Sequence, residues 1–371
     1  MKAKNIYFFI GTTAELIKVA PVLRELKRRR KKFKIIASNQ NVLNFDELEF
    51  ILGKQDIYYK NVLKFTKLPN NLYLRFIIWA IKTFGNFYLY FMSEFRNIDK
   101  KNSFFIVHGD TISALLGAVI AKIHGLKLVH IESGYRSFNF FEPFPEEFCR
   151  FVVSHLSDIL FCPNDWCLNN VKNNRGIKIS TGQNTVYESC IGTLKLKADY
   201  KLNHLNNQKF FLLILHRQEH MMFKKELAKK YLNLLLSFAK KDMKCLFVLH
   251  PITEKFLKNE NLLEQIKKNQ NIITVPRIPY LEFMKVLSKC EFIATDGGSN
   301  QQEAYFLGKP CLLLRRYTEQ IEGLYSNATL AKDDLNIVED FLLNYKKKIS
   351  KRISVKVLPS KIIVDTILNN S

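Results

Sequence analysis

Residues 104–150 read FFIVHGDTISALLGAVIAKIHGLKLVHIESGYRSFNFFEPFPEEFCR and decide the fold class, because a helical pattern joins two continuous apolar runs there. The first run, 104–107, is followed by His-Gly-Asp-Thr, and the second, 126–131, by Glu-Ser-Gly. Such runs predict parallel strands that are buried on both faces. Ligands of parallel sheets bind beyond the carboxyl ends of the strands, and Asp110 and Glu132 fall there.

The same alternation extends over the rest of the chain. It begins with a strand expected at 6–10 and a helix expected at 15–29. A polar segment rich in Lys and Asn, 195–209, carries little core-forming pattern and is the candidate linker. Beyond it, a strand expected at 210–215 restarts the alternation. The pattern therefore predicts two α/β halves.

The chain has 371 residues, which is long for a single core. We predict an α/β fold of two doubly wound, Rossmann-like domains that face a cleft, where a nucleotide and its substituent would bind. The expected boundaries are 1–195 for the N-terminal domain and 205–371 for the C-terminal domain. The last apolar pattern, 353–368, fits a helix or two short elements, and this end is also compatible with packing back on the first domain.

The chain is strongly basic, with 57 Lys and Arg against 34 Asp and Glu. A net charge of +23 suits nucleic acid or an anionic lipid surface. The excess is spread along the sequence, however, and the one dense cluster is KRRRKKFK at 27–34. Because the sequence has no recognised nucleic-acid motif, we expect no nucleic-acid partner. Segment 72–95 is too polar for a membrane span and predicts a long helix, which leaves a weak membrane-surface association open.

The seven cysteines form no CxxC pair and no His/Cys metal spacing. Several lie within apolar runs, so we interpret them as buried, reduced thiols of a cytoplasmic protein. The start, MKAKNIYFFIG, has only a short apolar run and predicts a first strand rather than a signal peptide. We expect neither a metal nor a cofactor.

Three carboxylates, Asp110, Glu132 and Glu146, are expected near one cleft. Proton transfer at carbon uses carboxyl groups whose pKa values are separated by a partly buried, like-charged setting. Each residue also fits a purely structural role, either as a helix cap or as an acid in the first turn of a helix. Arg150 follows Glu146 by four residues, so on a helix it could pair with Glu146 or with phosphate.

His216 and Arg217 directly follow the strand expected at 210–215. Cationic or hydrogen-bonding groups at a strand end could stabilise a departing phosphate. A lone histidine after a strand is more often structural than functional. With Arg217 and Glu219 beside it, the structural and functional interpretations of His216 are about equally supported.

Residues 292–303, FIATDGGSNQQE, predict a strand, a glycine turn and the start of a helix. The backbone amides and the positive helix end suit a diphosphate at Gly298 and Ser299. Glu303, one turn into the helix, could accept hydrogen bonds from ribose hydroxyls. The alternative is a plain strand-to-helix turn that Asp296 caps.

Ordered stretches over nearly the whole chain resemble the motifs of the bacterial UDP-N-acetylglucosamine 2-epimerases, mainly their non-hydrolysing branch. The matching stretches are Gly11–Lys18 (GTTAELIK), His108–Thr111 (HGDT), His130–Arg136 (HIESGYR), Pro145–Arg150 (PEEFCR), Thr181–Val186 (TGQNTV), His216–Glu219 (HRQE), Asp296–Ala304 (DGGSNQQEA) and Arg315–Glu322 (RRYTEQIE).

This resemblance implies a two-domain GT-B-type fold with a UDP-sugar in the cleft. It also implies that the C2 proton is removed, that UDP is eliminated to leave a glycal, and that UDP is added back with C2 inverted. By motif position, the acid/base carboxylates are Asp110, Glu132 and Glu146. The residues that contact the leaving diphosphate are Arg150 and His216. The residues that contact phosphate and ribose are Gly298, Ser299 and Glu303. Lys18 of the opening motif and Arg217 complete the predicted substrate-binding residues.

The chain departs from the family pattern at several positions. Thr13 and Ala14 stand where the family has Arg-Pro, which removes a phosphate-directed charge. Residues 37–41 (ASNQN) lack the QHR-type residues that serve activation by a second UDP-sugar, so we do not expect that activation. Gly297 and Ser299 exchange the family's Ser and Gly.

Our leading hypothesis is a cytoplasmic 2-epimerase that interconverts UDP-GlcNAc and UDP-ManNAc for surface polysaccharide synthesis. The alternatives are a hydrolysing 2-epimerase that releases ManNAc and UDP, and a membrane-surface glycosyltransferase with the same GT-B fold. We further expect a homodimer.

Overall fold

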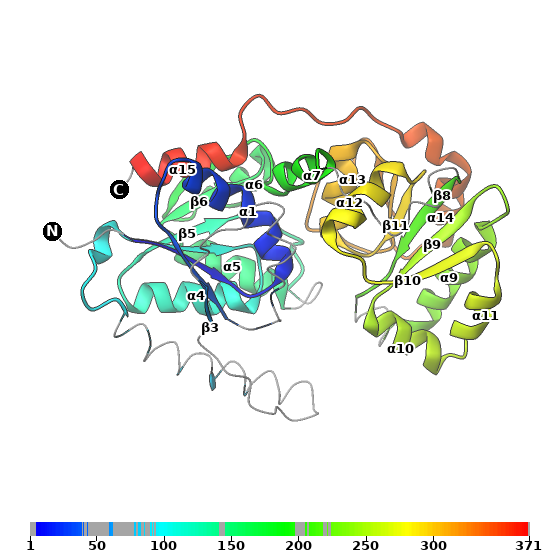
Figure 1. Ribbon diagram of the computed structural model, residues 1–371, viewed down its shortest axis with the longest axis horizontal. Coiled ribbons are helices and arrows are strands. Elements are labelled where there is room, and N and C mark those ends of the chain that lie inside the picture. Colours follow the sequence, from blue (N-terminus) through cyan, green and yellow to red (C-terminus); the bar gives the residue numbers. More distant parts are fainter. Residues whose placement is uncertain are drawn as a thin grey trace. The chain divides into compact units, whose positions relative to one another are not determined.

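The computed structural model describes residues 5–38, 40, 43, 59–61, 78, 81–82, 85, 90, 92, 94–140, 145–196, 205, 208–217, 221 and 224–369. It divides into two compact units, which Figure 1 shows with the elements labelled. The first unit comprises Met1–Ser189 together with Val355–Ser371, and the second comprises Cys190–Ser354. Most of the candidate linker at 195–209 and most of the helix expected at 72–95 lie outside the described residues.

The first unit is built on a sheet of seven parallel strands among the described residues, in the order β3-β2-β1-β4-β5-β6-β7. The strands are β1 (Ile6–Ile10), β2 (Lys34–Ala37), β3 (Tyr59–Asn61), β4 (Phe104–His108), β5 (Lys127–Ile131), β6 (Ile159–Cys162) and β7 (Ile177–Ser180). Both faces of the sheet are buried, because Phe8 and Ile10 lie in one apolar cluster while their neighbours Tyr7 and Phe9 lie in another.

Helices connect these strands and close both clusters. They are α1 (Thr13–Arg28), α4 (Ile112–Ile123), α5 (Glu146–Leu156), α6 (Asp165–Asn170), α15 (Pro359–Asn369) and the 3₁₀ turn η1 (Lys100–Asn102). Helix α7 (Val186–Leu194) begins in the first unit and ends in the second. The C-terminal helix α15, red in Figure 1, lies beside α1. Ile363, Val364 and Ile367 of α15 are buried in the cluster that also contains Leu16 and Val19 of α1. The C-terminal apolar pattern therefore includes a helix that completes the core of the first unit.

The second unit contains a six-stranded parallel sheet in the order β10-β9-β8-β11-β12-β13, counted over the described residues. Its strands are β8 (Phe210–Ile214), β9 (Lys244–Leu249), β10 (Ile272–Pro276), β11 (Ile293–Thr295), β12 (Cys311–Leu313) and β13 (Ala328–Leu330). Its helices are α9 (Lys225–Phe238), α10 (Pro251–Asn259), α11 (Leu263–Lys268), α12 (Tyr280–Lys289), α13 (Gly298–Leu307), α14 (Leu335–Asn344) and the 3₁₀ turn η3 (Tyr345–Lys348). Numbered within the unit, the strand order is 3-2-1-4-5-6, as in Rossmann folds.

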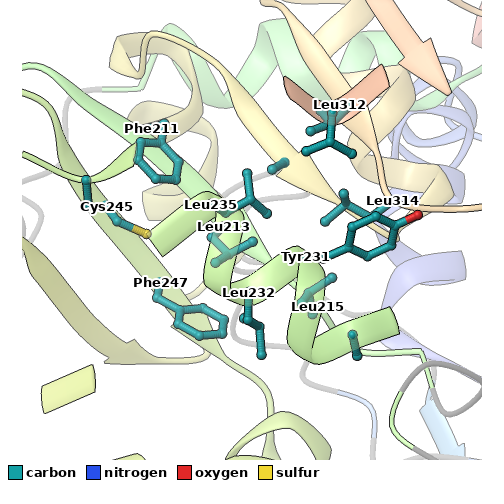
Figure 2. Close-up of a cluster of buried hydrophobic side chains, with 14 of the residues drawn as sticks. Phe211, Leu213, Leu215, Tyr231, Leu232, Leu235, Cys245, Phe247, Leu312 and Leu314 are labelled. Atoms are coloured by element: carbon teal, nitrogen blue, oxygen red, sulfur yellow. The ribbon is translucent and has the colours of Figure 1, made fainter. Parts of the chain in front are cut away.

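The core of the second unit forms where α9 packs on the sheet. Figure 2 shows Phe211 and Leu213 of β8 near Leu232 and Leu235 of α9, all of them buried. Phe211 also stacks on Phe292, with ring centroids 4.8 Å apart. Each fully buried side chain of this size contributes about 1.5–3 kcal/mol relative to its exposed state.

The predicted fold class is confirmed, since both units are Rossmann-like with parallel sheets and alternating helices. Helix α7 starts at Val186, after a turn in which Asn184 Oδ1 accepts from the Val186 amide. In the described part of the chain, no helix is long and apolar enough to cross a membrane.

Candidate functional site

In each unit the sheet order reverses at one point, and polar side chains follow the strands there. The reversal in the first unit lies between β1 and β4, and in the second between β8 and β11. Ligands of doubly wound sheets bind at such points, beyond the carboxyl ends of the strands. The predicted residues Asp110 and Glu132 follow β4 and β5, and His216 and Gly298 follow β8 and β11.

Glu132 is a buried carboxylate of the first unit that is held by an ion pair and a hydrogen bond. Its Oε1 accepts from Lys18 Nζ at 2.6 Å and from Asn184 Nδ2, and its side chain is only 7% exposed. Burial opposes ionisation, but Lys18 and the donors around the carboxylate outweigh it and lower the pKa of Glu132 to about 2. Glu132 is therefore an anion at neutral pH, and the predicted Lys18 and Glu132 form one ion pair.

The backbone around Glu132 is unusual as well. Glu132 has φ +67°, a region that non-glycine residues seldom adopt, and such strain clusters at functional sites. Gly109 lies against it with φ +64°, and a Cβ at this position would approach Glu132 Oε2 to 2.9 Å. Glycine is thus required where the HGDT stretch passes this carboxylate.

Two buried histidines flank the same carboxylate. His108 Nδ1 lies 3.6 Å from Glu132 Oε2, and His130 Nε2 donates to the Gly109 carbonyl at 2.7 Å. Burial lowers the pKa of His108 to about 3 and that of His130 to about 4, so both rings are neutral at pH 7.

Asp110 and Arg150 form a second charged pair in the first unit. Arg150 Nη2 donates to Asp110 Oδ2, while Arg150 Nη1 donates to Glu147 Oε2 at 3.4 Å. Glu146 begins α5, and burial together with the charges of Asp110 and Glu146 raises the pKa of Cys149 to about 12. The ion pair of Arg150 with Asp110 therefore joins the loop after β4 to the helix that Glu146 begins.

Two first-unit residues at this edge were missing from the predicted site. Asn184, which is 1% exposed, donates to Glu132, and its signal was the TGQNTV stretch. Glu15 accepts from the Gly11 amide at 2.6 Å and the Thr12 amide at 2.9 Å, and also from the Thr111 hydroxyl. The capping box formed by Thr12 and Glu15 at the start of α1 was the signal that could have found it.

Asp296 organises the strand ends of the second unit. Its carboxylate accepts from the amides of His216 at 3.0 Å and Arg217 at 2.9 Å, and His216 Nδ1 lies 3.1 Å from it. Helix α13 instead has Gly297 as its N-cap residue, without a side-chain cap bond. The carboxylate of Asp296 therefore binds the loop after β8, and the N-cap position of α13 belongs to Gly297.

The glycine turn is closely packed. A Cβ on Gly297 would approach His216 Cε1 to 2.8 Å, and one on Gly298 would approach Glu319 Oε1 to 2.8 Å. Ser299 follows in the first turn of α13, whose exposed amides and dipole favour an anion. Backbone rather than side chain is thus presented at this helix end.

Glu303 and two arginines surround that helix end. Glu303, 3% exposed, accepts from Asn300 Nδ2 at 2.9 Å. Arg217 Nε donates to the Asp296 carbonyl at 3.0 Å. Arg315, which sequence reasoning missed as a site residue despite its place in a matching stretch, is buried and donates from Nη2 to Glu319 at 2.6 Å. Among the described residues its buried Nη1 has no hydrogen-bond partner, and burial lowers its pKa from the ordinary value.

Comparison with known proteins decides the family. The family model described as UDP-N-acetylglucosamine 2-epimerase matches residues 92–352. The chain belongs to the UDP-N-acetylglucosamine 2-epimerase family. The family that the motifs predicted is thereby confirmed, as is the prediction that the chain belongs to a family of epimerase enzymes.

Relatives of this epimerase family match over almost the full length. A UDP-N-acetylglucosamine 2-epimerase of Methanococcus maripaludis is 33% identical, with 91% of this chain and 92% of the relative covered. The crystal structure of the Methanocaldococcus jannaschii UDP-GlcNAc 2-epimerase in complex with UDP-GlcNAc and UDP superposes with a TM-score of 0.81 at 26% identity, covering 99% of this chain and 100% of that one. The Neisseria meningitidis UDP-GlcNAc 2-epimerase bound to UDP-GlcNAc gives 0.79 at 27% identity, with 99% and 100% covered.

Proposed function

We propose that the protein is a nucleotide-sugar 2-epimerase that interconverts UDP-GlcNAc and UDP-ManNAc and supplies surface polysaccharide synthesis. The observation that carries this proposal is the pairing of two charged clusters at one sheet edge, Glu132 with Lys18 and Asp110 with Arg150. Family membership and relatives whose structures hold UDP-GlcNAc support the choice of substrate.

The first unit would carry the proton chemistry. A carboxylate takes the proton from C2, and the C1–O bond breaks with its electron pair going to UDP, which leaves the glycal. UDP then adds back to C1 with its original configuration, while a proton is delivered to the opposite face of C2. We assign proton transfer to Asp110, Glu132 and Glu146. Glu132 is ionised at neutral pH, which is the protonation state that a base requires, and Lys18 beside it holds the carboxylate in place.

The second unit would hold the UDP moiety. The amides at the start of α13, including those of Gly298 and Ser299, suit the diphosphate, and Glu303 suits the ribose hydroxyls. His216, Arg217 and the buried guanidinium of Arg315 would meet the negative charge that grows on UDP as it leaves.

Proton NMR with UDP-GlcNAc in deuterium oxide tests the proposal. We expect deuterium at C2 and the appearance of UDP-ManNAc; an intact folded protein that gives neither product nor exchange would contradict it. Irreversible release of ManNAc and UDP would identify the hydrolysing reaction instead.

The Asp110→Asn variant tests the assigned proton chemistry. We expect loss of C2 exchange by a factor of about 10²–10⁴, because the titrating group is gone while its size is kept. Calorimetric titration should show UDP affinity close to that of the unaltered protein. Retained turnover would show that Asp110 serves only the start of α4.

A further inference from the structure

Glu147, the neighbour of the predicted Glu146, is the most completely enclosed acid at the first unit's sheet edge. Its side chain has no solvent exposure. It receives hydrogen bonds from Arg136 Nε, from the Ser137 amide at 2.9 Å and from the Phe138 amide at 3.3 Å. A fourth donor, Arg150 Nη1, lies 3.4 Å from Oε2. A carboxylate in the first turn of a helix that served only the helix dipole would face solvent, and this one does not.

These donors come from two segments that meet at the site. Arg136, Ser137 and Phe138 belong to the loop that leaves β5 just after Glu132, whereas Glu147 and Arg150 belong to α5. Glu147 therefore ties the loop after Glu132 to the helix that carries Arg150. Since a carboxylate has two oxygens and about four lone-pair sites, these four donors fill its capacity.

The loop is shaped around this carboxylate. Phe138 has φ +57°, a left-handed conformation that its two flanking hydrogen bonds to Glu147 help to maintain. The Arg136 guanidinium lies over the rings of Phe138 and Phe151, 5.2 and 5.4 Å from their centroids. Arg136 is thus fixed by an ion pair and by two aromatic faces.

Arg150 transmits the arrangement to the reacting groups. Its guanidinium has one nitrogen on Glu147 and another on Asp110, so the planar fork is held at both ends. Without Glu147, the guanidinium would lose one of the two carboxylates that orient it. The orientation of Asp110 depends in turn on this fork.

We infer that Glu147 is a positioning residue of the site, which holds Arg150 against Asp110 and holds the loop after Glu132 in place. The inference rests on the proposed function, because its kinetic test measures kcat in the C2-exchange assay. Glu147 itself exchanges no proton with the substrate, because its oxygens are saturated by the four donors.

The test compares Glu147→Gln with the unaltered protein in the C2-exchange assay. The amide keeps the size of the side chain but turns one acceptor into a donor that faces other donors. We expect kcat to fall on the order of 10²-fold, as displacement of a catalytic group by about 1 Å does, with UDP affinity unchanged within about twofold. Glu147→Asp, which restores the charge at shorter reach, should recover part of the loss.

Glu188→Gln is the matched control. Glu188 is also buried in the first unit, but it accepts from the amide and hydroxyl of Ser360 at the start of α15, both at 2.7 Å. This variant should lower the melting temperature without lowering kcat. A Glu147→Gln protein that is folded and has wild-type kcat would overturn the inference.

A double-mutant cycle separates positioning from general destabilisation. If Glu147 acts partly through Arg150, the loss of kcat in the Glu147→Gln/Arg150→Lys protein should be smaller than the product of the two single losses, since coupled residues are not additive. Fully additive losses would overturn the inference and leave Glu147 a purely structural residue.

Nitrogen-15 NMR of the arginine side chains tests the role of Glu147 independently of the proposed 2-epimerase function. Failure of the unaltered protein in the exchange assay would contradict the proposed function, and the guanidinium signals would still judge Glu147. We expect the Arg150 signals, assigned by their loss in Arg150→Lys, to show slowed rotation that disappears in Glu147→Gln and persists in Glu188→Gln. Unchanged Arg150 signals in Glu147→Gln would overturn the inference.

Discussion

Glu15 joins the first strand end of the first unit to the β4 strand end, because its carboxylate accepts from the backbone after β1 and from Thr111. Burial raises its pKa from 4.5 to about 7, outweighing these hydrogen bonds, and the negative charge of Asp110 acts in the same direction. Protonation of Glu15 is therefore coupled to the hydrogen bonds that join these two strand ends.

The sign of this linkage gives a pH prediction. The folded state binds the Glu15 proton more tightly than the unfolded state, so the contribution to stability is complete below about pH 4.5 and is lost as pH rises through about 7. Over that window it amounts to on the order of 3 kcal/mol. Urea unfolding from pH 5 to 8 should show a decline that is weaker in Glu15→Gln. Identical pH slopes in the two proteins would refute this assignment.

Among the elements, α15 shows how a distant segment completes the core of the first unit. It is held by Glu188, which accepts from Ser360, and by the ion pair of Arg29 with Asp365. Its apolar residues complete the core around α1, the helix that carries Glu15 and Lys18. The core beneath α1 is therefore completed by residues more than 300 positions further along the chain.

Two isoleucines test this role of α15. Ile363 in α15 is fully buried, whereas Ile349, after η3, is 60% exposed. Ile363→Ala should lower the free energy of unfolding by about 2–4 kcal/mol, because it removes buried methyl groups and leaves a cavity. Ile349→Ala should change it by less than about 0.5 kcal/mol. Denaturant titration measures both, and equal effects would show that α15 is not part of the core.

The elements also show what the sequence could predict. Strands such as β1, β4 and β8 were found because continuous apolar runs are typical of strands buried in parallel sheets. β7 (IKIS) and β13 (ATL) were missed, since they are short edge strands whose residues are only partly buried. For them the pairing with a neighbour, rather than the local pattern, decides the conformation.

At the scale of the whole molecule, the site residues that sequence could predict are those at strand ends. Asp110 and Glu132 follow apolar runs directly, and parallel strands bring such positions to one edge. Asn184 and Glu147 could not be assigned roles in this way, because their contacts with Glu132 and Arg136 depend on how separate loops fold together. The two units have the same kind of sheet but differ at the strand ends. The first unit places charged side chains there, and the second places the amides of a helix N-terminus there.

That division of labour predicts where UDP acts. If the second unit holds the diphosphate, UDP should slow hydrogen exchange at the start of α13, around Gly298 and Ser299, while uridine, which lacks phosphates, should have little effect. At a UDP concentration of 100 times Kd only about 1% of the protein is free, so amides that exchange only in the free protein should slow by up to about 100-fold. Hydrogen exchange followed by mass spectrometry measures this. Equal slowing by uridine would contradict the diphosphate assignment, because only the phosphates are drawn to the amides of a helix N-terminus.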